Sequence, residues 1–320
     1  MRRGLALLAL AAAVAALVLL PHGLKNYGVY LLSLWALSAI AAQGLNLTLG
    51  YAGQVSLAQA AFLGIGAYTS ALLTTQGVSF WLALPAAALL AMALGALIGF
   101  PALRVQHHHL AFVTLGFNAL VYLVLRNEEW LTGGVYGISS IRRPSLLGFS
   151  LDRPIPFYYL CLGLLAATTA FLWHLTRSPW GRAFRAIRDN PARAASLGVS
   201  VRAYTLLAFA IGSGLAGVAG AAYAPLVEYV DPTPFGLSRS LALLLMVVVG
   251  GQGTLIGPLL GAALVTLAPE WLRWTEGYYL MLYALLVVLL MAVCPSGLMG
   301  LAARTRDALL SRKAPRLARA

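Results

Sequence analysis

Apolar residues follow one another in long runs along most of this chain, and short polar stretches separate the runs. A helix of roughly 20 residues, or a β-strand of about ten, crosses the hydrocarbon core of a bilayer. The runs have helix length, which predicts an all-α integral membrane protein with about ten transmembrane helices. The predicted crossings are residues 5–20, 29–49, 57–75, 80–100, 109–125, 157–176, 203–226, 239–249, 255–268 and 278–294.

The crossings 239–249 and 255–268 are shorter than the others, and a glycine-rich stretch separates them. The pair forms either two crossings or one broken span whose unwound backbone faces a cavity. The run 5–20 forms either an uncleaved helix or a signal peptide. An uncleaved helix is expected, because the run ends in Pro21 and His22 rather than in small residues.

Composition supports a membrane protein and changes how the charge is interpreted. Of the 320 residues, 61% are apolar and 10% are charged, which excludes an ordinary soluble globule. Lys and Arg outnumber Asp and Glu by 22 to 9, for a net charge of +13. In a soluble chain this excess would suggest nucleic acid as a partner. Here the basic residues lie between apolar runs, so they indicate membrane topology, and no nucleic acid partner is expected.

Basic residues gather in two stretches. Residues 177–202 hold six arginines against the single acidic residue Asp189, and the tail from Arg304 onward holds six basic residues against Asp307. The positive-inside rule places both stretches in the cytoplasm.

Ten crossings threaded from this assignment leave the loops 126–156 and 227–238 outside, with 15 basic residues inside and 7 outside. Both termini are then cytoplasmic. The expected organisation is a polytopic domain over residues 1–300, followed by a basic cytoplasmic tail over residues 301–320.

All nine acidic residues map to loops or helix ends. A translocated ion or proton usually needs a charged partner at membrane depth. Because no buried carboxylate is available, an energy source outside the bilayer is favoured; sodium sites built from carbonyls and hydroxyls are the alternative.

Small and uncharged polar residues take the place of charge within the predicted helices. They either line a translocation path or form packing contacts between helices. Between Asn46 and Gln59 the two readings are evenly balanced, because Gly50 and Gly53 interrupt the helix where polar side chains gather. The candidate path residues are Asn46, Gly50, Gly53, Gln54, Ser56, Gln59, Thr114 and Asn118, with Gly250, Gly251, Gln252, Gly253 and Thr254 from the second glycine-rich stretch.

The basic stretch from Trp180 to Val201 predicts two short helices. The first carries arginines at every third position, so they share one face. Asn190 can cap the second helix, which has Pro191 at its first position and Gly198 where a left-handed residue ends it. A helix of about seven residues is too short to fold alone, so it is expected to dock on something. A solvated loop that only sets topology is the alternative.

Three separated blocks carry a resemblance to a known family. They are Gly181-Arg182-Ala183-Phe184-Arg185-Ala186-Ile187-Arg188-Asp189-Asn190 with Ala194-Ala195-Ser196-Leu197-Gly198, then Gly50-Tyr51-Ala52-Gly53-Gln54-Val55-Ser56-Leu57-Ala58-Gln59 with Gly64, Gly66, Ala67 and Tyr68, and lastly Gly250-Gly251-Gln252-Gly253-Thr254 with Gly257 and Pro258. Over about residues 30–300 the chain resembles the permease subunits of branched-chain amino acid ABC importers, and the M-type subunit rather than its H-type partner.

The resemblance implies a type II ABC importer-like permease fold in the inner membrane, with a coupling loop at about 177–202 that docks on a cytoplasmic ATPase. The implied partners are an H-type permease, two ATPase subunits and an external substrate-binding protein. ATP and Mg would bind the ATPases, and this chain would bind no cofactor. The implied substrate is a branched-chain amino acid, with urea or short amides as alternatives. The implied ATPase-coupling residues are Gly181, Arg182, Arg185, Ala186, Arg188, Asp189, Asn190, Ala194, Ala195 and Gly198.

Catalytic and metal-site motifs are absent from the sequence. No phosphate-binding loop with its lysine occurs, so the chain is not expected to hydrolyse ATP alone, and no catalytic triad spacing is found. The run 107–109 of three histidines is expected to mark a helix boundary, and Cys161 and Cys294 to be inert thiols. The remaining alternative is a self-contained secondary carrier or channel for a small neutral solute, which would have no use for a docking helix.

Overall fold

The computed structural model describes residues 15–102, 107–146 and 149–272, and beyond these 278, 281–282, 284–285, 288–289 and 297–300. Most of the predicted crossings 5–20 and 278–294, and all of the tail 301–320, lie outside the described residues. So does Cys294.

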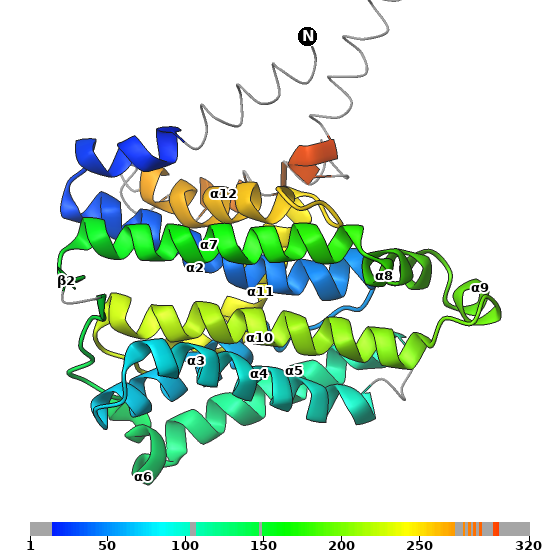
Figure 1. Ribbon diagram of the computed structural model, residues 1–320, viewed down its shortest axis with the longest axis horizontal. Helices are drawn as coiled ribbons and strands as arrows, with labels where there is room; N and C mark the ends of the chain where they lie inside the picture. Colours follow the sequence, from blue (N-terminus) through cyan, green and yellow to red (C-terminus); the bar gives the residue numbers. More distant parts are fainter. Residues whose placement is uncertain are drawn as a thin grey trace, which may run out of the picture.

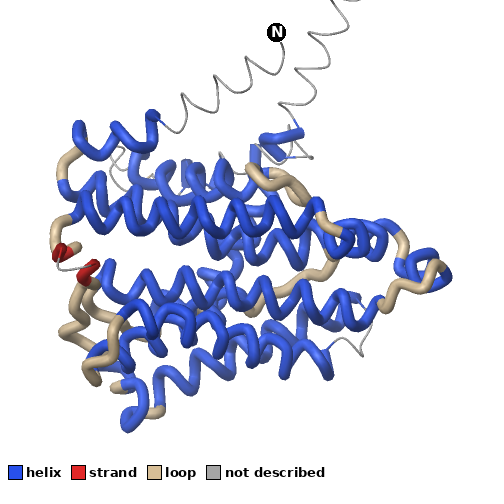
Figure 2. Tube along the Cα trace, viewed as in Figure 1, coloured by secondary structure: helices blue, strands red, loops and turns tan. Residues whose placement is uncertain are grey.

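Helices make up most of the described structure, as the apolar runs predict (Figure 2). Eight apolar helices match eight predicted crossings to within a few residues: α2 (Asn26–Asn46), α3 (Gln59–Thr75), α4 (Phe80–Ala102), α5 (His107–Asn127), α7 (Pro154–Arg177), α10 (Val201–Val227), α11 (Leu237–Gly250) and α12 (Gly257–Trp271). By length and composition, five segments of the described residues could cross a membrane: Asn26–Tyr51, Phe80–Pro101, Leu110–Asn127, Pro154–Arg177 and Val201–Val227.

The helices α2 and α10 lie at the centre of the bundle and are largely buried (Figure 1). Glycines allow α10 to approach its neighbours closely. A Cβ atom on Gly66 of α3 would overlap the backbone of Gly217, and one on Gly220 would overlap the carbonyl of Leu63. Small residues play this part in membrane proteins, because lipid supplies no hydrophobic drive for helices to associate.

The outer helices α4 and α5 present apolar side chains to their surroundings. Leu89 and Leu97 of α4 and Phe112 and Leu120 of α5 are all exposed. A surface of this kind suits acyl chains rather than water, so it agrees with a membrane location.

One end of the bundle carries the two loops that were predicted to share a side of the membrane. The first contains α6 (Glu129–Thr132), the 3-10 turn η3 (Gly134–Tyr136), and a hairpin of strands β1 (Ser145–Leu146) and β2 (Phe149–Ser150), which the all-α prediction missed. Reciprocal backbone hydrogen bonds of 2.9 Å join Ile138 to Val230, and Arg143 Nε lies 2.9 Å from Glu228 Oε1. The helices α8 (Pro179–Asp189) and α9 (Pro191–Ser196) lie at the opposite end (Figure 1).

The segment 237–271 forms two helices rather than one broken span. A Cβ atom on Gly250 would overlap the carbonyl of Gly257, and one on Gly261 would overlap the carbonyl of Met246, so α11 and α12 run antiparallel in close contact. With 14 and 15 residues, each is about 21–23 Å long, shorter than a hydrocarbon core of about 30 Å.

Candidate functional site: the α8–α9 pair and the broken helix

The helix α8 is amphipathic, with one face buried against the bundle and the other exposed. Ser178 caps it by accepting a 3.2 Å hydrogen bond from the Trp180 backbone N–H. Phe184 and Ile187 are fully buried against the bundle. The predicted arginine face is confirmed, because the three arginines of this helix are exposed: Arg182, Arg185 and Arg188.

The helix α9 begins and ends through the devices that the sequence predicts. The Asn190 side chain accepts a hydrogen bond of 3.0 Å from the Arg193 backbone N–H, and Pro191 occupies the first position. Gly198 adopts a φ of +83°, in the left-handed region that favours glycine. The helix ends at Ser196, one residue earlier than expected.

The small residues of α9 divide between two surfaces. Ala194 is 1% exposed and packs within the chain, whereas Ala195 is exposed. Leu197 follows the helix with 81% of its surface exposed. Of the two α9 alanines in the candidate coupling set, Ala195 is therefore the one that a partner could reach.

A tight turn attaches α8 to the end of α7. A Cβ atom at Gly181 would overlap the backbone carbonyl of Thr176, so only glycine fits there. Ala186 lies half-buried five residues further along α8. This close contact therefore fixes the start of α8 relative to the end of α7.

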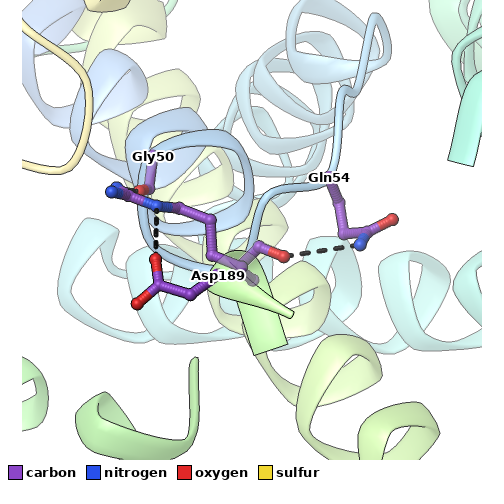
Figure 3. A network of polar contacts seen from close by, with 5 residues as sticks. Gly50, Gln54 and Asp189 are labelled. Carbon is purple, nitrogen blue, oxygen red and sulfur yellow. Dashed lines mark hydrogen bonds and ion pairs between the residues drawn. The ribbon is translucent and has the colours of Figure 1, made fainter. Parts of the chain in front are cut away.

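Arg188 reaches from α8 to the end of the central helix α2. Its Nη1 donates a hydrogen bond to the Gly50 carbonyl, and its Nε lies 3.8 Å from Asp189 Oδ1 (Figure 3). Two glycines make room for the side chain. A Cβ atom on Gly53 would lie 3.0 Å from Arg188 Cγ, and one on Gly253 would overlap Nη1.

The loop that joins α11 to α12 also contacts the end of α2, where it is hydrogen-bonded to Asn46. The Asn46 side chain donates to the Thr254 carbonyl at 2.8 Å and accepts from the Gly253 backbone N–H at 2.9 Å. Gly250 and Gly251 are buried beside this contact, and Gln252 is exposed. Three blocks that lie far apart in the sequence therefore converge at the end of α2.

The chain unwinds after α2, as the two glycines predict. The helix continues into a π-helical turn, η2 (Leu47–Tyr51), and residues 52–58 are extended or bent before α3 begins at Gln59. Gln54 is buried in this segment, and its amide donates to the Ala52 carbonyl at 3.4 Å.

The unwound segment returns into the bundle. Gln59 Nε2 donates to the carbonyls of Ala41 on α2, at 2.9 Å, and Gly212 on α10, at 3.2 Å. Ala41 precedes Gly50 by nine residues, or about 13 Å along the helix. The third predicted crossing therefore begins inside the bundle and not at its end.

Polar side chains among the candidate path residues, together with Ser240, accept hydrogen bonds from backbone N–H groups of the unwound segment and of the first turn of α3, directly or through one another. Thr114 accepts from the Leu57 N–H at 3.0 Å, and Ser56 accepts from the Ala58 N–H at 3.3 Å. Asn118 accepts at 3.3 Å from the Ser240 hydroxyl, which in turn accepts from the Ala60 N–H at 3.0 Å. Within lipid an unpaired N–H is costly, so these contacts stabilise the break. That the same residues line a path stays a prediction.

Arg239 is a residue whose position the sequence analysis missed. The predicted crossing 239–249 begins at this arginine, whereas α11 begins at Leu237, and the partly buried Arg239 donates from Nη2 to Ser38 of α2 at 2.9 Å. Its place as the first residue of the predicted crossing 239–249 was the available signal.

The histidine run, the cysteines and possible metal ligands were the remaining positions of interest in the sequence. The structure describes α5 from His107 onward, and residues 103–106 lie outside the described residues, so the helix boundary expected at 107–109 stays a prediction. Cys161 is a buried free thiol in α7. No group of three potential metal-ligating side chains occurs among the residues that the structure describes.

Several apolar helices of membrane-spanning length, packed through glycines around a broken helix, define a multi-pass membrane protein. The family model described as "Branched-chain amino acid transport system / permease component" matches residues 27–292, and the chain belongs to this family. It is accordingly a multi-pass protein of the inner membrane, and its family is one of transport-system permease components.

Curated relatives agree with this assignment. The chain is 37% identical over 280 residues to the high-affinity branched-chain amino acid transport system permease protein LivM of Escherichia coli (strain K12), which covers 80% of this chain and 66% of that protein. The Salmonella typhimurium LivM is 36% identical with the same coverage. The autoinducer 2 import system permease protein LsrC of Enterobacter sp. (strain 638) is 34% identical over 194 residues, covering 57% of this chain and 54% of LsrC. The chain thus spans just under two thirds of the LivM proteins' length. No solved structure gives a significant match.

Proposed function

We propose that this chain is the transmembrane permease subunit of an ATP-driven importer, that its substrates are branched-chain amino acids, and that it uses α8 and α9 to receive motion from separate ATPase subunits. The family and the LivM relatives support the substrate class. The chain itself contains no phosphate-binding loop, so ATP and Mg would bind the partner subunits.

The observation that carries the proposal is the contact between Arg188 and the Gly50 carbonyl. In this scheme the exposed surface of α8 and α9 docks on an ATPase, and closure of the ATPase pair displaces both helices. Arg188 then passes the displacement to the broken helix, and Asn46 carries it to the loop at Gly253.

The proposed assembly contains this chain, an H-type permease, two cytoplasmic ATPase subunits and an external substrate-binding protein. The proposed topology has ten crossings in a type II ABC importer-like fold, with α8, α9 and both termini in the cytoplasm. The arginines between residues 177 and 202 support that orientation. The pairing of Ile138 with Val230 supports a shared external side for the two loops at the opposite end.

A secondary carrier driven by an ion gradient is the competing function. Uptake of leucine is measured in proteoliposomes that contain ATP and no ion gradient, with and without the ATPases and the binding protein. The proposal expects uptake only with the complete set of proteins. Gradient-driven uptake by this chain alone would overturn it. Urea and a short amide as substrates in the same vesicles test the alternative solutes.

The docking surface is tested separately at Ala195. A tryptophan at this exposed position should leave membrane insertion intact and abolish copurification with the ATPase, because a flat contact has no room for an indole. Ala195→Ser is the matched control and should behave as the unmodified chain. Copurification and transport that survive Ala195→Trp would place the contact elsewhere.

A further inference from the structure

A cavity of about 360 Å³ lies at the end of the bundle opposite α8 and α9. The helices α2, α3, α10 and α11 form its walls, and the 3-10 turn η4 (Thr233–Phe235) contributes Thr233 and Pro234. This turn begins three residues after Val230, whose backbone pairs with Ile138 of the other loop at that end. The volume lies within the range of about 300–1,000 Å³ that is typical of small-molecule sites.

Arg239 supplies the positive charge of this cavity. Its guanidinium donates to the Ser38 hydroxyl at 2.9 Å, and neither of the two ion pairs within the described residues, Arg143–Glu228 and Arg188–Asp189, involves it. A partly buried cation without a carboxylate partner is costly, and ionisable residues within membrane segments commonly mark substrate pathways. The charge is therefore available to an anionic ligand.

The remaining walls divide by chemistry. Tyr30 and Tyr223 line the cavity with Arg239, and their hydroxyls make no hydrogen bond to another part of the described chain. Leu34, Leu63 and Ala242 form an aliphatic wall. Thr233 and Ser238 add two more hydroxyl-bearing residues to the lining. One cation, several hydroxyls and an aliphatic surface match a small molecule with a carboxylate at one end and a branched aliphatic group at the other.

We infer that this cavity is a binding site for an aliphatic amino acid on its way through the permease, with the carboxylate on Arg239. The inference rests on the proposed function and refines it by naming the group that is recognised. Urea and simple amides lack a carboxylate and would leave the guanidinium uncompensated, so the cavity favours amino acids over them. Arg239 can pair bidentately with a carboxylate, which a lysine cannot reproduce.

The test uses the complete importer in proteoliposomes supplied with ATP and leucine-loaded binding protein. Arg239→Gln should lower leucine uptake about ten- to hundredfold, the range for losing a charge-assisted hydrogen bond. Arg239→Lys should retain more uptake than Arg239→Gln, and Tyr223→Phe should lose less than either. Copurification of the ATPase should stay unchanged in all three. The control Lys25→Gln removes an exposed cation just ahead of α2 and should leave uptake unchanged.

Three results would overturn the inference. One is leucine uptake by Arg239→Gln at the rate of the unmodified importer. Another is a lowered melting temperature with lost ATPase copurification in both Arg239→Gln and Arg239→Lys, which would assign the arginine a structural role. The third is lowered uptake by Arg239→Gln together with a lost dependence of the melting temperature on anionic lipid, which would identify a lipid headgroup as the occupant. Failure of the unmodified complex to import leucine would instead refute the proposed function.

Discussion

Removing the Arg188 side chain should uncouple ATP hydrolysis from transport without detaching the ATPase. In Arg188→Ala the Gly50 carbonyl loses its charged donor, and the space between Gly53 and Gly253 is left unfilled. The helix α8 itself should stay in place, because Phe184 and Ile187 remain buried beneath it.

The size of the effect follows from the contact. A hydrogen bond to a charged group contributes roughly 1.5–3 kcal/mol. The Arg188 side chain is 43% exposed, so solvent competes for the guanidinium and the lower end of that range applies. About 1.4 kcal/mol corresponds to a factor of ten in an equilibrium. We therefore expect the population in which α8 and the broken helix move together to fall about tenfold.

The assay is the number of leucine molecules imported per ATP hydrolysed by the full complex. Arg188→Ala should lower this ratio about tenfold, with copurification of the ATPase preserved, and Arg188→Lys should give an intermediate value. The matched control is Arg182→Ala on the same helix, because the Arg182 guanidinium has no hydrogen bond or ion pair among the described residues. That variant should weaken ATPase binding and leave the ratio of the remaining complex intact. An unchanged ratio in Arg188→Ala would refute the role of this contact in coupling.

Three further substitutions test the parts around this contact. Gly181→Ala should lower the melting temperature and ATPase copurification, because its Cβ would overlap the Thr176 carbonyl. The control Gly163→Ala should change neither, because a Cβ at residue 163 would meet no atom within 4 Å. Equal behaviour of the two variants would refute the tight turn. Gln59→Leu should lower the free energy of unfolding by about 1–3 kcal/mol, since two buried carbonyls lose their donor; an unchanged melting temperature would contradict this. Asn190→Ala should destabilise α9 by about 1 kcal/mol, seen as faster amide hydrogen exchange there, whereas Asn190→Asp should retain the cap.

Local signals predicted the α8–α9 pair well, because its determinants lie next to one another in the sequence. A cap at Asn190, a proline after it and a glycine at residue 198 define a short helix without reference to the rest of the molecule. The apolar runs likewise predicted eight helices to within a few residues. In lipid the length and polarity of a run are nearly sufficient to define a helix, because the backbone has no other way to pair its polar groups.

Long-range contacts could not be predicted in the same way. The sequence separates Arg188 from Gly50 by 138 positions and Asn46 from Gly253 by 207, and no pattern in either segment identifies its partner. The arginine at residue 239 was missed for a related reason. A cation at the first position of a run is compatible both with an external loop and with a polar contact to a neighbouring helix, and only the packing of α11 on α2 distinguishes them.

The convergence at the end of α2 also indicates which parts of the bundle should move. Motion is least costly where few backbone hydrogen bonds must break, which here means residues 52–58 and the loop 251–256. The core formed by α3, α4 and α10 should resist deformation, because the helix backbones are in close contact at Gly66, Gly217 and Gly220. Arg188 and Asn46 contact the two unwound segments and not the rigid core. A displacement of α8 should therefore change the shape of the broken helix while the surrounding helices stay nearly fixed, which is the behaviour required of a gate.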